Sequence, residues 1–166
     1  MHAVKPPPFL FVLALCFVLA LPAGAQSGGG ETFFFGPLAE TALFSVKSAA
    51  FGGGLIAAYG YNAGAIGLKA AWFADTGELN TLEMAVFLRF YIPPRGGAGF
   101  FIQLDGGSSL FSRGGGFSLP AGAGGVSAGL SAGWRFLLGR HWFVEPYLRA
   151  GYPYIAGAGA SAGFRL

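Results

Sequence analysis

The last 25 residues of the chain, 142 to 166, alternate between apolar side chains and small or polar ones. Every even-numbered residue from Trp142 to Leu166 is apolar, and the charged residues all occupy odd positions: Glu145, Arg149 and Arg165. Successive side chains of a strand point to opposite faces, so this period of two predicts β structure with one apolar face. Such a face is buried in a soluble sandwich, or it faces lipid in a membrane barrel with a polar lumen.

Composition favours the barrel. Charged residues make up 10% of the chain, against roughly 25% in ordinary soluble domains, and the mean hydropathy is +0.58. So few charges cannot provide a soluble domain with a hydrated surface. The 30 glycines argue against a helical membrane protein. The sequence has no cluster of Lys and Arg, so we expect no nucleic-acid partner.

Residues 1–25 have the pattern of a secretory signal peptide. A weakly basic start precedes an unbroken apolar run from Phe9 to Leu21, and Ala23 and Ala25 form a small-residue cleavage site. Two alternatives remain open, namely that the run stays as an uncleaved anchor and that Cys16 is a lipidated residue. The 13-residue run is short for a helix that must cross about 30 Å of hydrocarbon. The predicted mature chain lacks cysteine, which excludes thiol catalysis and cysteine-bound metals.

Four more segments repeat the parity of the C-terminal region: 64–74, 79–92, 99–111 and 124–138. The C-terminal region itself supplies two strands, which gives six. Residues 40–48 and 51–59 are plausible as two further strands, and 26–39 are a Gly-rich leader or the start of the first strand. Across the six regular strands every charge lies on the odd face, which we predict to be a luminal charge network: Lys69, Glu83, Arg89, Asp105, Arg135, Glu145, Arg149 and Arg165.

The fold predicted from these strands is all-β, an eight-stranded antiparallel transmembrane barrel over residues 40–166. Closure of the sheet satisfies every backbone polar group in lipid. Turns are predicted at 61–63, 93–97 and 139–141 on the side of the termini, with loops at 75–78, 112–123 and 152–154 on the other side. Aromatic residues near strand ends are expected at the membrane interfaces: Phe90, Tyr91, Trp134, Phe136, Trp142, Tyr152, Tyr154 and Phe164.

The chain resembles the small outer-membrane β-barrel superfamily of OmpA-, OmpX- and OmpW-type proteins. The resemblance rests on the signal-peptide ending at residues 23–25, on Leu88-Arg89-Phe90-Tyr91 before a turn, and on the Ala162–Leu166 ending. It implies a monomer in the outer membrane of a diderm bacterium, with its termini in the periplasm. It also implies delivery by periplasmic chaperones to the barrel-assembly machinery, with Phe164 and Leu166 as the assembly signal. Members of the superfamily prefer a C-terminal aromatic residue, from which Leu166 departs.

We expect no enzyme, no metal site and no cofactor, because the predicted mature chain has a single histidine, His141, placed in a predicted periplasmic turn. An eight-stranded barrel is just wide enough for side chains to fill it, so one interpretation is a filled, mainly structural barrel. A second is an OmpW-like channel or binder for small apolar solutes, because strands with large inward side chains oppose strands with small ones across the barrel. A third is a surface-exposed adhesin or host-interaction protein, which requires long outer loops.

Two turns predict the register of neighbouring strands. A three-residue turn centred on Arg140 pairs residues whose numbers sum to 280 and places Arg135 opposite Glu145. A turn centred on Thr76 gives a sum of 152 and places Lys69 opposite Glu83. Both pairs then lie on the odd face, where opposite charges can meet across adjacent strands.

Overall fold

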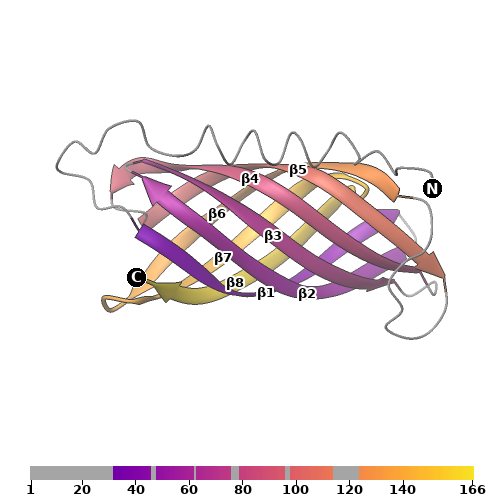
Figure 1. Cartoon of the computed structure of the whole chain (residues 1–166), viewed down its shortest axis with the longest axis horizontal. Helices are drawn as coiled ribbons and strands as arrows, with labels where there is room; N and C mark the ends of the chain where they lie inside the picture. The colour runs from indigo at the N-terminus through magenta and orange to yellow at the C-terminus, as the bar shows by residue number, and fades with distance from the viewer. Residues whose placement is uncertain (1–31, 46–47, 62, 76–78, 96–97, 114–123) are drawn as a thin grey trace, which may run out of the picture.

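The computed structural model describes residues 32–45, 48–61, 63–75, 79–95, 98–113 and 124–166. They form a closed antiparallel barrel in which each strand pairs with its neighbours in the sequence and β1 pairs with β8. The strands are long and strongly tilted (Figure 1). Their bounds are β1 (Thr32–Ser45), β2 (Ser48–Tyr61), β3 (Gly64–Asp75), β4 (Leu79–Arg95), β5 (Ala98–Arg113), β6 (Gly124–Leu138), β7 (Trp142–Tyr152) and β8 (Ala156–Arg165).

The predicted all-β, eight-stranded antiparallel barrel is confirmed. β6 has the predicted bounds, whereas β4 continues to Arg95 through two prolines that we expected to end it. The β4–β5 register shifts between Ile92 and Arg95, and prolines are tolerated at such irregular strand ends. β1 begins at Thr32, eight residues before the predicted start at 40. The predicted signal peptide, and residues 26–31 of the predicted leader, lie outside the described residues.

The barrel has two distinct ends. We call the end where β1 begins and β8 finishes the terminus end, and the other the loop end (Figure 1). Connections β2–β3, β4–β5 and β6–β7 lie at the terminus end, as predicted for the turns on the side of the termini. Among the described residues, no helix is long and apolar enough to cross a membrane.

The inward face changes parity around the barrel. Odd-numbered residues point inward from β3 to β8, but even-numbered residues point inward in β1 and β2, as buried Leu38 and Ile56 show. Between β2 and β3, and between β8 and β1, each odd-numbered residue pairs with an even-numbered one. Paired residues share a face, so the inward parity switches at these two strand pairs. Large apolar side chains such as Leu55, Leu148 and Val126 cover the outer surface.

One predicted register is right and one is wrong. β6 and β7 pair residues whose numbers sum to 280, as in Gly133 with Tyr147. β3 and β4 sum to 154 rather than 152, so Glu83 lies opposite Ala71 and not opposite Lys69. β3 extends one residue beyond its predicted end, to Asp75, which moves the centre of the connection from residue 76 to residue 77.

Candidate functional site

The inside of the barrel collects most of the charged residues of the described strands. Seven of the eight residues predicted for the luminal network are buried, none more than 8% exposed: Lys69, Glu83, Arg89, Asp105, Arg135, Glu145 and Arg149. The eighth, Arg165, is half-buried at the terminus end, where its Nη2 donates to the carbonyl oxygen of Arg140 at 3.2 Å. The buried residues form two groups.

The first group, the Arg149 network, lies toward the loop end. The guanidinium of Arg149 contacts Glu40 Oε1 at 2.7 Å and Glu83 Oε2 at 3.1 Å. Lys69 Nζ lies 2.7 Å from Glu83 Oε1, and the hydroxyl of Tyr147 donates to Glu40 Oε2 at 3.0 Å. Two cations thus face two carboxylates, and the network is neutral.

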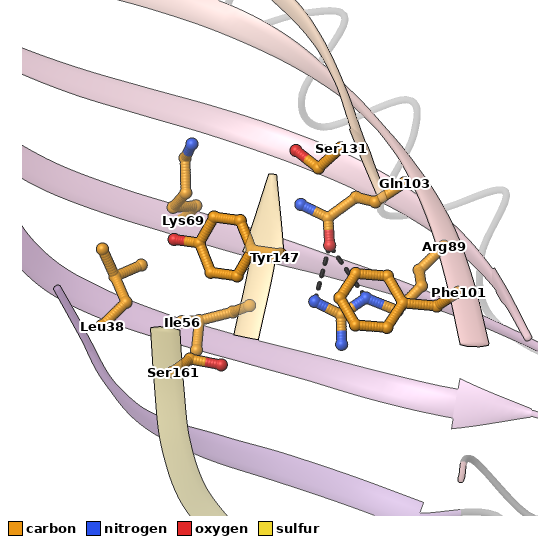
Figure 2. A pocket seen from close by; sticks show the side chains of 9 residues that line it. All are labelled: Leu38, Ile56, Lys69, Arg89, Phe101, Gln103, Ser131, Tyr147 and Ser161. Carbon is orange, nitrogen blue, oxygen red and sulfur yellow. Dashed lines mark hydrogen bonds between the residues drawn. The ribbon is translucent and has the colours of Figure 1, made fainter. Parts of the chain in front are cut away.

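The second group, the Glu145 network, lies toward the terminus end. Arg89 Nη1 contacts Glu145 Oε1 at 2.6 Å, and Arg135 Nε reaches the same oxygen. Ser161 donates to the other oxygen at 2.8 Å. Arg89 also donates twice to the amide oxygen of Gln103, at 2.6 and 2.8 Å (Figure 2).

The Glu145 network extends along β5 to a second carboxylate. The amide nitrogen of Gln103 donates to Asp105 Oδ1 at 2.7 Å, and Ser131 donates to Asp105 Oδ2 at 3.2 Å. The network thus contains two cations, Arg89 and Arg135, and two carboxylates, so it is also neutral. Gln103 and Ser131, rather than an arginine, hold Asp105. Charges buried away from water are costly unless they are paired or hydrogen-bonded, so the balance of charge and these hydrogen bonds allow this lumen to be both polar and closed.

Glu40 is the network residue that the sequence reasoning missed. It lies at an even position of β1, outside the odd-face pattern of the later strands, and it is 3% exposed. A usable signal was present, because a carboxylate in the middle of a lipid-contacting strand belongs on its luminal side. Glu40 alone could have fixed the inward face of β1. Lys69 and Glu83 meet despite the incorrect register, because they are diagonal neighbours on one face.

Aromatic rings close the terminus end of the lumen. The guanidinium carbon of Arg135 packs against two rings, 3.9 Å from the centroid of Phe34 and 4.4 Å from that of Phe143. Arg89 lies 4.1 Å from the centroid of Phe101. These distances are within the range of cation–π contacts, so the rings cover the cations of the Glu145 network.

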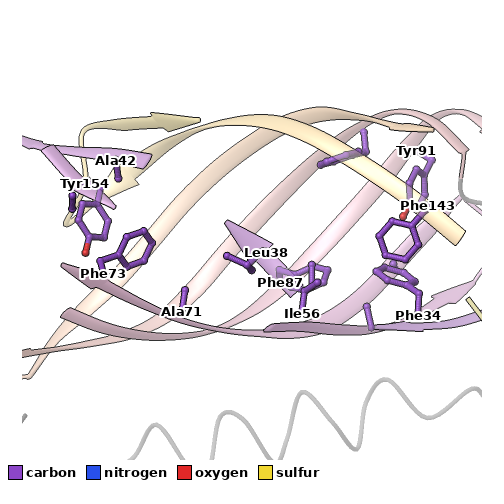
Figure 3. Close-up of a cluster of buried hydrophobic side chains, with 14 residues drawn as sticks. Phe34, Leu38, Ala42, Ile56, Ala71, Phe73, Phe87, Tyr91, Phe143 and Tyr154 are labelled. Carbon is purple, nitrogen blue, oxygen red and sulfur yellow. The ribbon is translucent and has the colours of Figure 1, made fainter. Parts of the chain in front are cut away.

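A second aromatic pair closes the loop end. Phe73 and Tyr154 pack with their centroids 4.7 Å apart, and each is at most 1% exposed. Figure 3 shows this pair at one end of the lumen, and Phe34, Tyr91 and Phe143 at the other.

Two interfacial assignments are therefore wrong, since Tyr91 and Tyr154 are buried inside the barrel. Tyr91 occupies an odd, inward position of β4. Tyr154 lies between the end of β7 and the start of β8, where the strand alternation no longer applies.

Glycines of β6 and β8 lie under the inward rings of adjacent strands. A Cβ added at Gly133 would lie 2.7 Å from Phe101 Cζ and 2.7 Å from Tyr147 Cβ. One added at Gly159 would lie 2.6 Å from Tyr147 Cζ. Large inward side chains thus fill the space over glycines on the next strand, and the space that we expected across the barrel diagonal is occupied at these positions.

A small cavity separates the two networks. Its volume is about 10 Å³, near the least that holds one water molecule. Its lining is mixed, with Leu38 and Ile56 on one side and Lys69, Gln103 and Ser161 among the polar residues (Figure 2). A cavity of this size does not accommodate an organic solute.

Comparison with known proteins identifies the fold. No protein-family model and no curated protein matches the sequence. Among solved structures, Neisserial surface protein A matches with a TM-score of 0.57 and 13% identity, over 85% of this chain and 99% of that one. The N-terminal barrel domain of Pseudomonas aeruginosa OprF matches with a TM-score of 0.53 and 15% identity, over 84% and 100%. OprG from Pseudomonas aeruginosa matches with a TM-score of 0.50 and 11% identity, over 86% and 99%.

The chain has the fold of the small eight-stranded outer-membrane β-barrels. The resemblance derived from the sequence is thereby confirmed for the fold. At identities this low the likeness concerns architecture alone, and what distinguishes this barrel is its own lumen.

The described part of this barrel contains no group of three or more His, Cys, Asp or Glu residues able to hold a metal ion. His141 is exposed in the β6–β7 turn, and its Nδ1 lies 3.1 Å from the carbonyl oxygen of Arg165. Its contacts are those of a residue that joins a turn to the end of β8. Arginine, lysine, serine and tyrosine side chains donate hydrogen bonds to the luminal carboxylates. These contacts stabilise the buried negative charges.

Proposed function

We propose that the mature chain is an integral protein of the bacterial outer membrane whose barrel is closed and mainly structural, without catalysis. Its outer surface of large apolar side chains suits hydrocarbon, and its charged residues are paired inside. In this proposal the bilayer is its principal partner, and chaperones with the barrel-assembly machinery deliver it there as a monomer.

One observation carries the proposal of a closed lumen. From the terminus end to the loop end, the interior contains an aromatic group, the Glu145 network, a cavity of about 10 Å³, the Arg149 network and a second aromatic pair. These groups fill the lumen and leave no open path for ions. Because each network is electrically neutral, the lumen also has no net charge that would favour cations or anions.

The assembly signal is part of the same proposal. Phe164, near the end of β8, packs against Trp142 with centroids 5.3 Å apart and stacks on His141 at 5.2 Å. Leu166 is 70% exposed, and its backbone nitrogen donates to the carbonyl oxygen of Phe33 at 2.9 Å. Both residues lie beside the seam where β8 closes on β1.

A vesicle release assay tests this function. The mature chain is folded into phosphatidylcholine vesicles loaded with a small anionic dye, and folding is verified by a mobility shift on boiling. We expect the folded protein to be retained in the vesicles after carbonate washing and to release dye no faster than protein-free vesicles. Rapid dye release would contradict a closed barrel, and uptake of a small apolar solute would support the OmpW-like alternative instead.

A further inference from the structure

The β6–β7 turn at the terminus end is held firmly against the end of β8. Arg165 donates its backbone N–H to the carbonyl oxygen of His141 at 2.6 Å and its guanidinium to the carbonyl oxygen of Arg140 at 3.2 Å. Gly139 has a φ of +75°, which permits the tight reversal. Arg140 and His141 are exposed on this fixed turn, so their side chains project from a rigid support.

Large apolar side chains adjoin this turn on the outer surface. Trp142 is 59% exposed and Leu138 56% exposed, and they are the paired residues on either side of the turn. Trp142 also packs edge-on against Phe164. Tryptophan concentrates at the headgroup level of membranes, so Trp142 marks where the hydrocarbon ends and places Arg140 at the depth of lipid phosphates.

None of the Asp and Glu side chains that the structure describes lies at the outer rim of the terminus end. Glu40, Glu83, Asp105 and Glu145 are buried in the lumen, and Asp75 lies at the loop end. Among the described side chains at the outer rim of the terminus end, exposed Arg140 therefore brings a positive charge that no carboxylate side chain offsets.

We propose that the β6–β7 turn binds the phosphate of an anionic phospholipid in the leaflet at the terminus end. The guanidinium of Arg140 donates to the phosphate oxygens. The acyl chains lie against Trp142 and Leu138. This inference rests on the proposed function, because it requires the barrel to span a bilayer.

Tryptophan quenching by brominated lipids tests the site. Trp72 and Trp134 are replaced by phenylalanine, which leaves Trp142 as the only reporter. The protein is folded into phosphatidylcholine vesicles containing dibrominated phosphatidylglycerol, or the same mole fraction of dibrominated phosphatidylcholine. We expect the anionic lipid to be enriched about two- to fivefold beside Trp142, the range for one arginine near an anionic surface.

The matched control is a barrel that retains only Trp72, on the outer face near the loop end, where both brominated lipids should quench equally. Arg140→Gln in the Trp142 reporter should abolish the preference, and Arg140→Lys should retain part of it. Raising the salt concentration should also reduce the preference without any substitution, which covers the case in which Arg140→Gln fails to fold. Equal quenching of Trp142 by both lipids would overturn the site, whereas no quenching by either lipid would overturn the membrane-spanning function.

Discussion

Glu145 receives contacts from three luminal side chains, and its replacement tests whether the lumen is dry. Glu145→Gln removes the charge that balances Arg89 and Arg135, which are both 2% exposed. We expect the free energy of unfolding to fall by about 3–5 kcal/mol if the site is dry, and by less if water enters. Urea titration of the folded protein in detergent measures this. Arg140→Gln, at the exposed turn, is the control and should change stability by about 0.5 kcal/mol or less.

The pairing itself is tested by a double-mutant cycle. Arg135→Gln and Glu145→Gln together should cost less than the sum of the two single changes, because each single change leaves the other partner buried without its counter-charge. Arg89 keeps its hydrogen bonds to Gln103 in the double variant, so some destabilisation should remain. Strictly additive costs in the same titration would show that Arg135 and Glu145 are not in contact.

Glycine packing can be tested at two positions of adjacent strands. A Cβ at Gly133 would lie 2.5 Å from the carbonyl oxygen of Pro146 and 2.7 Å from the Phe101 ring, whereas one at Gly106 meets nothing within 4 Å. We expect Gly133→Ala to destabilise the barrel by about 1–3 kcal/mol through overpacking. Gly106→Ala should be close to neutral. If both variants unfold at the same urea concentration, aromatic rings do not rest on the β6 glycines as described.

At the scale of the element, the inward face of β1 differs from that of the later strands. Phe34 is 1% exposed inside the barrel, whereas Phe35 is 46% exposed on the outer surface. With Trp72, Trp134 and Trp142 replaced by phenylalanine, Phe35→Trp should be strongly quenched by brominated lipid. Phe34→Trp should be protected. The reverse result would mean that β1 shares the odd-inward parity of β3 to β8.

A comparison of β1 with β6 shows which features of the fold can be predicted from the sequence. β6 and its register with β7 were predictable, because strict alternation fixes the faces and a three-residue turn fixes the pairing. The first half of β1 was not, since Phe33, Phe34 and Phe35 are consecutive and make both faces apolar, which leaves Glu40 as the signal for its inward face. The convergence of Glu40 and Glu83 on Arg149 joins residues from β1, β4 and β7. Such a contact depends on the curvature of the closed sheet, which local alternation does not specify.

At the scale of the whole molecule, closure of β8 on β1 should make the barrel resistant to detergent. A closed sheet has no edge from which unfolding can begin, and each strand pairs with a neighbour on both sides. We expect a far-ultraviolet circular dichroism spectrum dominated by β structure, and a gel mobility that changes only after boiling. A predominantly helical spectrum of the mature chain would contradict the barrel.

The central claim is that two neutral ion networks and two aromatic groups close the lumen from end to end. Planar-bilayer recording of the folded wild-type protein tests this claim most directly, because it measures ion passage through single molecules. Because these networks and rings lie on both sides of the cavity of about 10 Å³, we expect no long-lived conductance steps in concentrated potassium chloride. Stable, porin-sized steps from protein verified as folded would contradict the account.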